Sequence, residues 1–547
     1  MAEPTDKLTR FRLGGLRWVA EPWLEGALRE RIGPNLGRLE QAGASLVKRS
    51  TTRAVYRLEL GGRAVFVKHH LLRSLAERLK YLVLRSRAAS EWAASRALAE
   101  RGIPAARAVA VAERRAAGIL CEAVLITEDI AGARPLSAVI GEDLGRAPTG
   151  ESFRRKRRLL RAVAELVRQT HESDVFHRDL HGGNILVRNG DLFLIDLHRV
   201  SLGPVSVSQR AANLGQLLAY LPGLLSPGDR MHVVRSYLGD DFAGASLHDL
   251  ARAVGRHEVR FRERRYASRA KRCVKRSTRF RGGRIDGLRA HRRVDIPADQ
   301  VVEAIRKHRT TDRVLKQDHR SRVTVVDVAG RPVCVKEFIR PGLLQRLGAL
   351  VCGSKARRAW LGAHALAVRG MGTPPPLAIA EAGGRSYFIT EFVEGAAQFK
   401  HYVAERCRPG PGEPARRWHR FVRRAAEFVR RLHDQRVYHR DLSAKNILVC
   451  QEDDDWQFLL VDTSDVRRRR APSLREKVRN LGQLGQIYVQ PARSDRLRFY
   501  RQYTRGRPQL DDPELLEQID AISRARHEHW LESDEAKRLG HQPESDQ

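Results

Sequence analysis

Apolar and polar residues alternate in two short, paired runs of the chain. The runs VYRLEL and AVFVK, at 55–60 and 64–68, are rich in strand-forming residues and flank a Gly-Gly turn. This combination predicts a β-hairpin. The runs VTVVDV and PVCVK, at 323–328 and 332–336, flank Ala-Gly-Arg in the same way. The pattern therefore predicts a β-rich region in each half of the chain.

Helical periodicity follows each of these hairpins. The stretch 86–102 is typical of a helix, and Gly102 with Pro104 supplies its stop signal. Further on, each half carries an amphipathic pattern with apolar residues at i, i+1, i+4, i+7 and i+8. These positions are Leu159, Leu160, Val163, Leu166 and Val167 in one half, and Phe421, Val422, Ala425, Phe428 and Val429 in the other. Each half is thus predicted to be a small β-rich lobe followed by a mainly helical lobe, an α+β fold.

The two halves also repeat each other in sequence. HRDLHGGNILV at 177–187 returns as HRDLSAKNILV at 439–449, an offset of 262 residues. Four more blocks recur in the same order at offsets of up to 268 residues: AVFVK with PVCVK, LITEDIAG with FITEFVEG, LIDL with LVDT, and NLGQL with itself. Such ordered self-similarity indicates duplication of one domain. We expect a first domain over 1–255, a second over 296–547, and between them at 256–295 a basic linker or leading segment of the second copy.

Composition adds information about partners. The 547 residues contain 42% hydrophobic residues, enough for real cores, so global disorder is excluded. A formal net charge of +37 favours a polyanionic partner: nucleic acid, an anionic membrane face or a phosphorylated glycolipid. Arginine is scattered along the chain, so a generally arginine-rich surface is the alternative explanation. The stretch 256–295 is the best candidate for an anion-binding strip, and a solvated connector is its alternative.

Cysteine usage and hydropathy suggest a cellular location. The six cysteines have no C-x-x-C spacing, which disfavours a zinc site and fits a reducing compartment. The N-terminal segment lacks an apolar core of signal-peptide length. No uncharged apolar run reaches about 18 residues, so no membrane span is predicted. We expect a cytoplasmic protein, with peripheral contact at the inner face of the cytoplasmic membrane as an option.

One residue in the first copy is available for each requirement of phosphoryl transfer, which needs positioning, metal ions and a cation on the phosphates. Lys68, at the end of a strand, would pair with the phosphates of ATP, and Glu91 on the following helix would hold that lysine. Asp179, in the HRD motif, would orient the acceptor hydroxyl. Asn184 and Asp196 would be the ligands of Mg²⁺. The expected cofactors are therefore ATP and Mg²⁺.

The second copy keeps most of this set. Lys336 would bind ATP, Asp441 is the candidate catalytic residue, and Asn446 and Asp462 are the candidate metal ligands. Alignment of the tryptophans at 92 and 360 places Ala359 where the first copy has its glutamate. We therefore expect a second site that is impaired and serves in substrate docking or regulation.

These motifs resemble the protein-kinase-like superfamily over nearly all of both copies. The departures from an ordinary protein kinase are informative. No G-x-G-x-x-G precedes Lys68; a phosphate-covering loop there would rely on residues 50–52 and on backbone. Asp196 is followed by Leu-His rather than Phe-Gly, and no A-P-E motif occurs before NLGQL. A peptide-docking segment has little room, which favours a non-peptide acceptor.

Within this superfamily the chain resembles the bacterial lipopolysaccharide kinases, which phosphorylate heptose or Kdo sugars of the lipid A core. The resemblance rests on RSTTRAVYRLEL, on FHRDLHGGNILV, on LIDLHRV and on the NLGQL motif. It implies two tandem protein-kinase-like bilobal domains. It further implies ATP-dependent transfer to a sugar hydroxyl of an anionic glycolipid. A basic surface suits such a partner.

Three other functions share parts of this evidence. A small-molecule phosphotransferase would use the same catalytic residues, but its acceptors are usually cationic or neutral, against the charge of +37. A serine/threonine protein kinase is a further alternative. A tandem pseudokinase scaffold on membrane or nucleic acid would explain the charge but not the complete residue set of the first copy. Nucleic acid is the less favoured polyanion and is left open as a partner.

Overall fold

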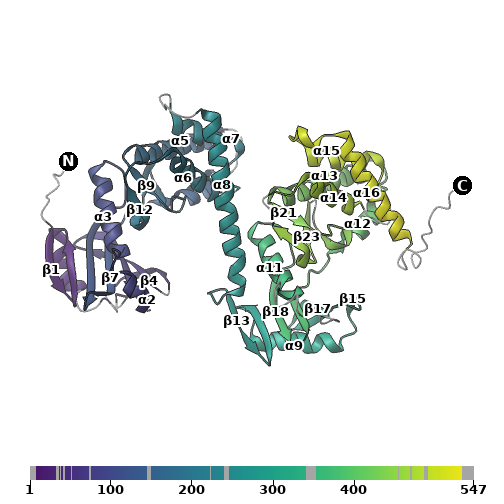
Figure 1. Cartoon of the computed structure of the whole chain (residues 1–547), viewed down its shortest axis with the longest axis horizontal. Coiled ribbons are helices and arrows are strands. Elements are labelled where there is room, and N and C mark those ends of the chain that lie inside the picture. The colour runs from purple at the N-terminus through teal and green to yellow at the C-terminus, as the bar shows by residue number, and fades with distance from the viewer. Residues whose placement is uncertain are drawn as a thin grey trace. The chain divides into compact units, whose positions relative to one another are not determined.

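The chain forms two compact units, Met1–Arg264 and Arg265–Gln547, called here the first and the second copy (Figure 1). The structure is a computed structural model. It describes residues 8–32, 36, 39–40, 43–50, 52–72, 75–144, 150–221, 223–239, 246–339, 353–382, 384–453, 455–468, 471–485 and 491–532.

The β-rich lobe of the first copy is an antiparallel seven-stranded sheet in the order β1-β2-β6-β7-β5-β4-β3. Its two faces carry different helices. Leu24 and Leu28 of α1 join Ile126 in the core on one face, whereas Ala88 of α3 joins Leu125 on the other. The strands are β1 (Thr9–Leu13), β2 (Leu16–Ala20), β3 (Ser45–Arg49), β4 (Arg53–Leu60), β5 (Arg63–Leu71), β6 (Ala108–Ala116) and β7 (Ile119–Glu128), and the helices α1 (Pro22–Arg31), α2 (Leu75–Lys80) and α3 (Arg87–Glu100).

The rest of the first copy is mainly helical and packs around the predicted amphipathic helix, α5. Its apolar stripe is buried as expected, with Leu159 partly exposed at the edge. Two small sheets, β11-β10-β8 and β12-β9, carry the catalytic motifs. The elements are β8 (Arg134–Pro135), α4 (Leu136–Ala138), α5 (Gly150–Glu172), β9 (Val175–His177), β10 (Ile185–Arg188), β11 (Asp191–Leu194), β12 (Val200–Leu202), α6 (Val207–Ala219), α7 (Pro227–Leu238) and α8 (Leu247–Ala270).

The second copy repeats this architecture. Its large sheet has the order β13-β14-β18-β19-β17-β16-β15, which matches the first strand for strand. The elements of the sheet lobe are β13 (Phe280–Ile285), β14 (Leu288–Arg293), α9 (Ala298–Thr310), β15 (Val314–Asp318), β16 (Ser321–Val328), β17 (Arg331–Ile339), α11 (Lys355–Val368), β18 (Pro376–Ala382) and β19 (Arg385–Glu391). Those of the helical lobe are β20 (Ala397–Gln398), α12 (Phe399–Arg406), α13 (Glu413–Asp434), β21 (Val437–His439), β22 (Ile447–Glu452), β23 (Asp455–Leu460), β24 (Val466–Arg468), α14 (Leu474–Leu484), α15 (Arg493–Thr504) and α16 (Pro513–Leu531).

The basic stretch 256–295 is structured along its whole length. Helix α8 runs through the boundary between the copies, and β13 and β14 form a hairpin whose second strand pairs with β18 of the second sheet. This hairpin is the counterpart of β1–β2, so 280–293 leads the second copy rather than linking the two. Its strand character is hidden in the sequence because arginine and glycine occupy most of its positions.

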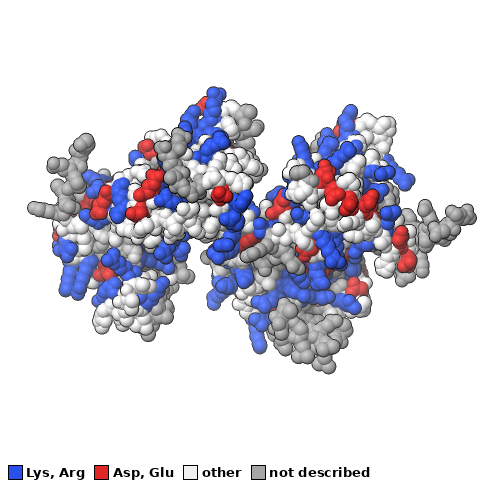
Figure 2. Space-filling view, turned by 45° about the horizontal axis from the view of Figure 1, so that its top comes forward, with Lys and Arg blue, Asp and Glu red and all other residues white. Residues whose placement is uncertain are grey.

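Basic side chains occur on the surface of both copies. In the view of Figure 2, lysine and arginine lie on both copies and are densest on the lower part of the second. Among the described helices, none is both long and apolar enough to cross a membrane. Five of the cysteines are free thiols, and Cys352 lies outside the described residues.

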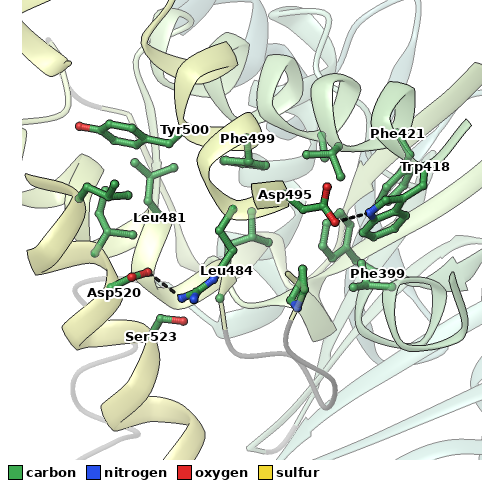
Figure 3. A pocket seen from close by; sticks show the side chains of 18 residues that line it. Phe399, Trp418, Phe421, Leu481, Leu484, Asp495, Phe499, Tyr500, Asp520 and Ser523 are labelled. Carbon is green, nitrogen blue, oxygen red and sulfur yellow. Dashed lines mark hydrogen bonds and ion pairs between the residues drawn. The ribbon is translucent and has the colours of Figure 1, made fainter. Parts of the chain in front are cut away.

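An apolar cavity of about 110 Å³ lies among the helices of the second copy (Figure 3). Two polar contacts join residues that line it. The Trp418 indole nitrogen donates to the Asp495 carboxylate at 2.7 Å, and Arg496 pairs with Asp520 at 2.9 Å. No predicted catalytic residue lines this cavity.

Candidate active site

The lysine–glutamate pair of the first copy forms as predicted. Lys68 lies on β5 and Glu91 on α3, a helix that begins at the N-cap Ser86, whose hydroxyl accepts from the backbone of the first turn. The Lys68 ammonium lies 2.5 Å from a Glu91 carboxylate oxygen, and only 14% and 4% of the two side chains are exposed. Because little water competes for either charge, the carboxylate holds the ammonium in a fixed position.

The loop after β9 carries the predicted catalytic carboxylate. The Asn184 side-chain nitrogen donates to the Asp179 backbone oxygen at 2.9 Å, which leaves the Asn184 amide oxygen available for a cation. The Asp179 carboxylate accepts from the Gln216 amide at 3.3 Å and lies 3.6 Å from the Arg199 guanidinium. Asp179 is therefore oriented from two sides, by helix α6 and by the segment that follows Asp196.

Asp196 follows β11 in the left-handed region, with φ of 61°, which directs the chain sharply out of the strand. Its carboxylate lies 3.2 Å from the His198 ring and 3.4 Å from the Arg53 guanidinium. Burial alone would raise the pKa of Asp196. The hydrogen bond from His198 and the charges of Lys68, His198 and Arg53 nevertheless hold that pKa well below its usual range.

These groups fit a magnesium ion by their chemistry. Mg²⁺ prefers oxygen ligands, and the ionised Asp196 carboxylate and the Asn184 amide oxygen are of that kind. Among the residues that the structure describes, Glu91, Asp196 and His198 have ligand atoms within 4.8 Å of one another. Of these three, Glu91 is already paired with Lys68 and His198 offers only a nitrogen. Asp196 therefore supplies the carboxylate oxygen for the metal.

A buried chain of hydrogen bonds, called here the relay, connects the helices to the loop that carries the HRD motif in both copies. In the first, the His171 ring contacts the Tyr237 hydroxyl at 2.8 Å and the Asn213 oxygen at 3.0 Å, and the Asn213 nitrogen donates to the His177 backbone oxygen at 3.0 Å. Burial lowers the pKa of His171 to about 4, so the ring is neutral at physiological pH. The second copy repeats every contact with His433, Tyr503, Asn480 and His439.

The lysine of the second copy has a different partner. Ala359 replaces the glutamate, as the tryptophan alignment predicts, because the N-caps Ser86 and Ser354 start the two helices in register. The Lys336 ammonium instead lies 2.9 Å from the Asp462 carboxylate. The candidate metal ligand of this copy is thus already paired with the lysine that should bind phosphate.

Close packing accompanies this change. The Thr463 hydroxyl donates to the Ala359 backbone oxygen at 2.8 Å, which joins α11 directly to the segment that follows Asp462. A methyl group added at Gly362 would lie 2.0 Å from the Thr463 backbone oxygen. The first copy has Ala94 at the position of this glycine, so α11 approaches that segment more closely than an alanine would permit.

The carboxylate predicted to be catalytic in the second copy is also engaged. Asp441 lies 3.3 Å from the Arg526 guanidinium, on the last helix α16, and 3.6 Å from the Lys445 ammonium. Asn446 donates to the Asp441 backbone oxygen at 2.9 Å, as its counterpart does in the first copy. The Gln483 amide contacts the Leu442 and Arg440 backbone instead of the carboxylate. Charge pairs therefore occupy both acidic residues of this site.

The structure brings every predicted site residue into one of two clusters, one in each copy. Of the predicted phosphate-covering loop, Ser50 accepts from the Arg53 backbone at 3.0 Å to close a turn between β3 and β4, and Thr51 lies outside the described residues. Sequence reasoning missed Arg53, Gln216 and the relay beneath the loop. The repeated NLGQL motif is the signal that could have pointed to Gln216 and Asn213.

We expect Glu91→Gln to lower kcat for phosphate transfer by about 10- to 100-fold, because a neutral amide holds the lysine less firmly and misplaces the phosphates. The measurement is steady-state turnover over a range of ATP concentrations. Glu100→Gln, an exposed change on the same helix, is the matched control. Equal turnover in the two variants would contradict the role given to Glu91.

Comparisons with known proteins agree with this geometry. The model of the lipopolysaccharide kinase (Kdo/WaaP) family matches residues 39–237 and 345–503, thus both copies. A relative in Pseudomonas aeruginosa, lipopolysaccharide core heptose(I) kinase WaaP, is 30% identical over 200 residues, covering 34% of this chain and 73% of that protein. The Escherichia coli protein of the same name is 29% identical over 163 residues, covering 28% of this chain and 60% of its own length.

Two solved structures are also similar. One is WaaP in complex with acyl carrier protein, 26% identical, with a TM-score of 0.34, covering 46% of this chain and 97% of that one. The other is an aminoglycoside-3'-phosphotransferase of type VIII, 20% identical, with a TM-score of 0.29, covering 43% of this chain and all of that one.

The family match and the architecture together confirm two sequence predictions, the tandem protein-kinase-like fold and phosphotransferase activity. The match extends over more than half of the chain and includes the HRD motifs of both copies, whereas Lys336 lies outside it. The chain therefore belongs to the lipopolysaccharide kinase (Kdo/WaaP) family.

Proposed function

We propose that the first copy transfers the γ-phosphate of ATP to a sugar hydroxyl of a lipopolysaccharide-core-like glycolipid. The observation that carries the proposal is the intact Lys68–Glu91 pair in the same copy as Asp179, Asn184 and Asp196. The similarity to heptose kinases supports the choice of acceptor.

Each side chain then has a defined task. Lys68, held by Glu91, binds the phosphates of ATP. Asp179, oriented by Gln216, accepts a hydrogen bond from the attacking hydroxyl and aligns it with the γ-phosphate. Asn184 and Asp196 would hold Mg²⁺, which neutralises charge on the phosphate oxygens when bound. Arg199, near Asp179, is placed to attract a negatively charged acceptor.

For the second copy we propose a role in docking the acceptor or regulating the first, with little transfer of its own. Lys336 and Asp462 neutralise each other, and Arg526 and Lys445 surround Asp441. Ion pairs also occur at Asp179 and Asp196 of the first copy, so the feature particular to the second is the Lys336–Asp462 pair, which ATP and metal would have to break before binding. In the first copy, by contrast, the lysine has a dedicated partner in Glu91.

Incubation with γ-labelled ATP and purified acceptors tests the proposed function. We expect label in lipopolysaccharide whose core sugars lack phosphate, and much less in an aminoglycoside, a basic protein substrate or a nucleic acid. Label mainly in the aminoglycoside or in protein would contradict the proposed acceptor but would still agree with kinase activity. No transfer to any acceptor would contradict enzymatic activity and favour the scaffold alternative.

We further expect salt-sensitive binding to anionic glycolipid, with the protein peripheral at the inner face of the cytoplasmic membrane. The net charge of +37 supplies the attraction, and exposed charges are screened over about 8 Å at physiological ionic strength. Sedimentation with lipopolysaccharide-containing vesicles at rising salt measures the effect. Vesicles of neutral lipid are the control. Binding to duplex DNA or RNA but not to these vesicles would contradict the membrane location.

A further inference from the structure

A cavity of about 400 Å³ in the second copy has arginine at four of its six lining positions. It lies where the end of β21, the strand β24 and the helix α14 meet, beside the catalytic loop. Its lining residues are Tyr438, Arg440, Arg467, Arg475, Glu476 and Arg479.

The helix contributes its basic side chains from one face. Arg475 and Arg479 are four residues apart on α14, so they project from the same side of the helix. Glu476, the one acid in the lining, is engaged in the helix cap, where its carboxylate accepts from the Ser473 backbone at 2.9 Å and from the Ser473 hydroxyl at 3.2 Å. The cavity therefore has an excess of positive charge that its own acid does not offset.

Three of these arginines have no internal partner within the described part of the chain. Arg440, Arg475 and Arg479 are exposed, and their side chains make no hydrogen bond or ion pair with another described residue. Like charges at this helical spacing destabilise the helix by a few tenths of a kcal/mol. An anion that binds between the arginines would reverse that effect.

The first copy has no such cavity lining, although its backbone is equivalent. Pairing of β12 with β9 matches that of β24 with β21, and the capping boxes at Ser206 and Ser473 set α6 and α14 in register. The corresponding residues are Phe176, Arg178, Ser201, Ser208, Gln209 and Ala212. One arginine is shared and three are particular to the second copy, so the charge is not a requirement of the fold.

We propose that this cavity binds the phosphate group of a phosphorylated sugar. Guanidinium groups match the geometry of phosphate oxygens with two parallel hydrogen bonds each. A volume of about 400 Å³ lies in the range of small-molecule sites and exceeds what a bare phosphate fills, which leaves space for a sugar ring beside Tyr438. The proposal goes beyond the transfer reaction and holds whichever copy performs it.

Calorimetry on the full chain without ATP tests this site, with glucose 1-phosphate as the probe and glucose and inorganic phosphate for comparison. The variant Arg475→Gln/Arg479→Gln is expected to weaken glucose 1-phosphate binding by about 100-fold, about tenfold for each guanidinium–phosphate interaction that the substitutions remove. The matched control is Arg306→Gln/Arg423→Gln, which removes two exposed arginines of the same copy outside the cavity. The control is expected to bind as the unmodified chain does.

The outcomes separate this site from the catalytic one. Equal loss in the two variants, or none in either, would overturn the proposal, as would inorganic phosphate binding as tightly as the sugar phosphate or a phosphoserine peptide binding more tightly. Vesicles of phosphatidylcholine with lipid A, compared with phosphatidylcholine alone, identify the source. If the vesicles with lipid A bind the protein and the Arg475→Gln/Arg479→Gln variant loses this binding, the ligand is a lipid-linked sugar phosphate. If only glucose 1-phosphate binds, the ligand is a free sugar phosphate.

Discussion

Asp196→Asn is expected to reduce phosphate transfer by about 10³-fold or more, with the fold unchanged. The substitution keeps the shape of the side chain but removes the negative charge, which the surrounding Arg53, His198 and Lys68 hold in the ionised state. A neutral amide binds Mg²⁺ weakly, so charge on the transferring phosphate would go uncompensated. Turnover at several Mg²⁺ concentrations measures the effect.

The second copy provides the matched control for this variant. Asp462→Asn removes the same group from the other site, where the carboxylate is paired with Lys336, and we expect it to leave most of the turnover intact. A normal melting temperature in each variant separates chemistry from folding. Transfer that survives Asp196→Asn but not Asp462→Asn would place the reaction in the second copy.

Asp179→Ala is expected to lower transfer by about 10²- to 10⁴-fold, because the acceptor hydroxyl loses the group that orients it and accepts its proton. The side chain is partly buried, but its charged partner Arg199 is exposed, so its removal leaves no buried charge unpaired. The effect should fall mainly on kcat, with the KM for ATP nearly unchanged, since the phosphates contact other residues.

Asp441→Ala is the corresponding change in the second copy and should have a much smaller effect on total turnover. It releases Arg526 and Lys445 from their ion pairs. If this variant loses most of the activity, the second copy performs the transfer and the proposed roles of the two copies are reversed.

The sequence predicted the fold well wherever local pattern and repeat agreed. The two hairpins, the helix from Arg87 and the stripe of α5 all form as expected, because each depends on neighbours within about 20 positions. The predicted strand ends were wrong, since β5 and β17 continue three residues beyond Lys68 and Lys336. The repeat then transferred each element to the second copy. The replacement at Ala359 was also predictable, since it needs only an alignment of two helices.

Contacts between distant segments were not predictable in this way. Arg526 reaches Asp441 from 85 positions away, and Arg53 reaches Asp196 from 143 positions away. No periodicity reports such pairs, and in a chain with 101 lysines and arginines any single arginine is inconspicuous. The hairpin 280–293 was not predicted for a related reason. Strand formation there depends on pairing with β18 rather than on β-branched residues.

The close approach of α11 to the segment after Asp462 limits what a single substitution can restore in the second copy. The Thr463 backbone oxygen lies where a methyl group at position 362 would be, and the Thr463 hydroxyl donates to the Ala359 carbonyl. Ala359→Glu alone would supply the missing carboxylate but leave both of these contacts and the Lys336–Asp462 pair in place. The new glutamate would therefore have to compete with Asp462 for the lysine, so one substitution is not expected to convert the second site into a copy of the first.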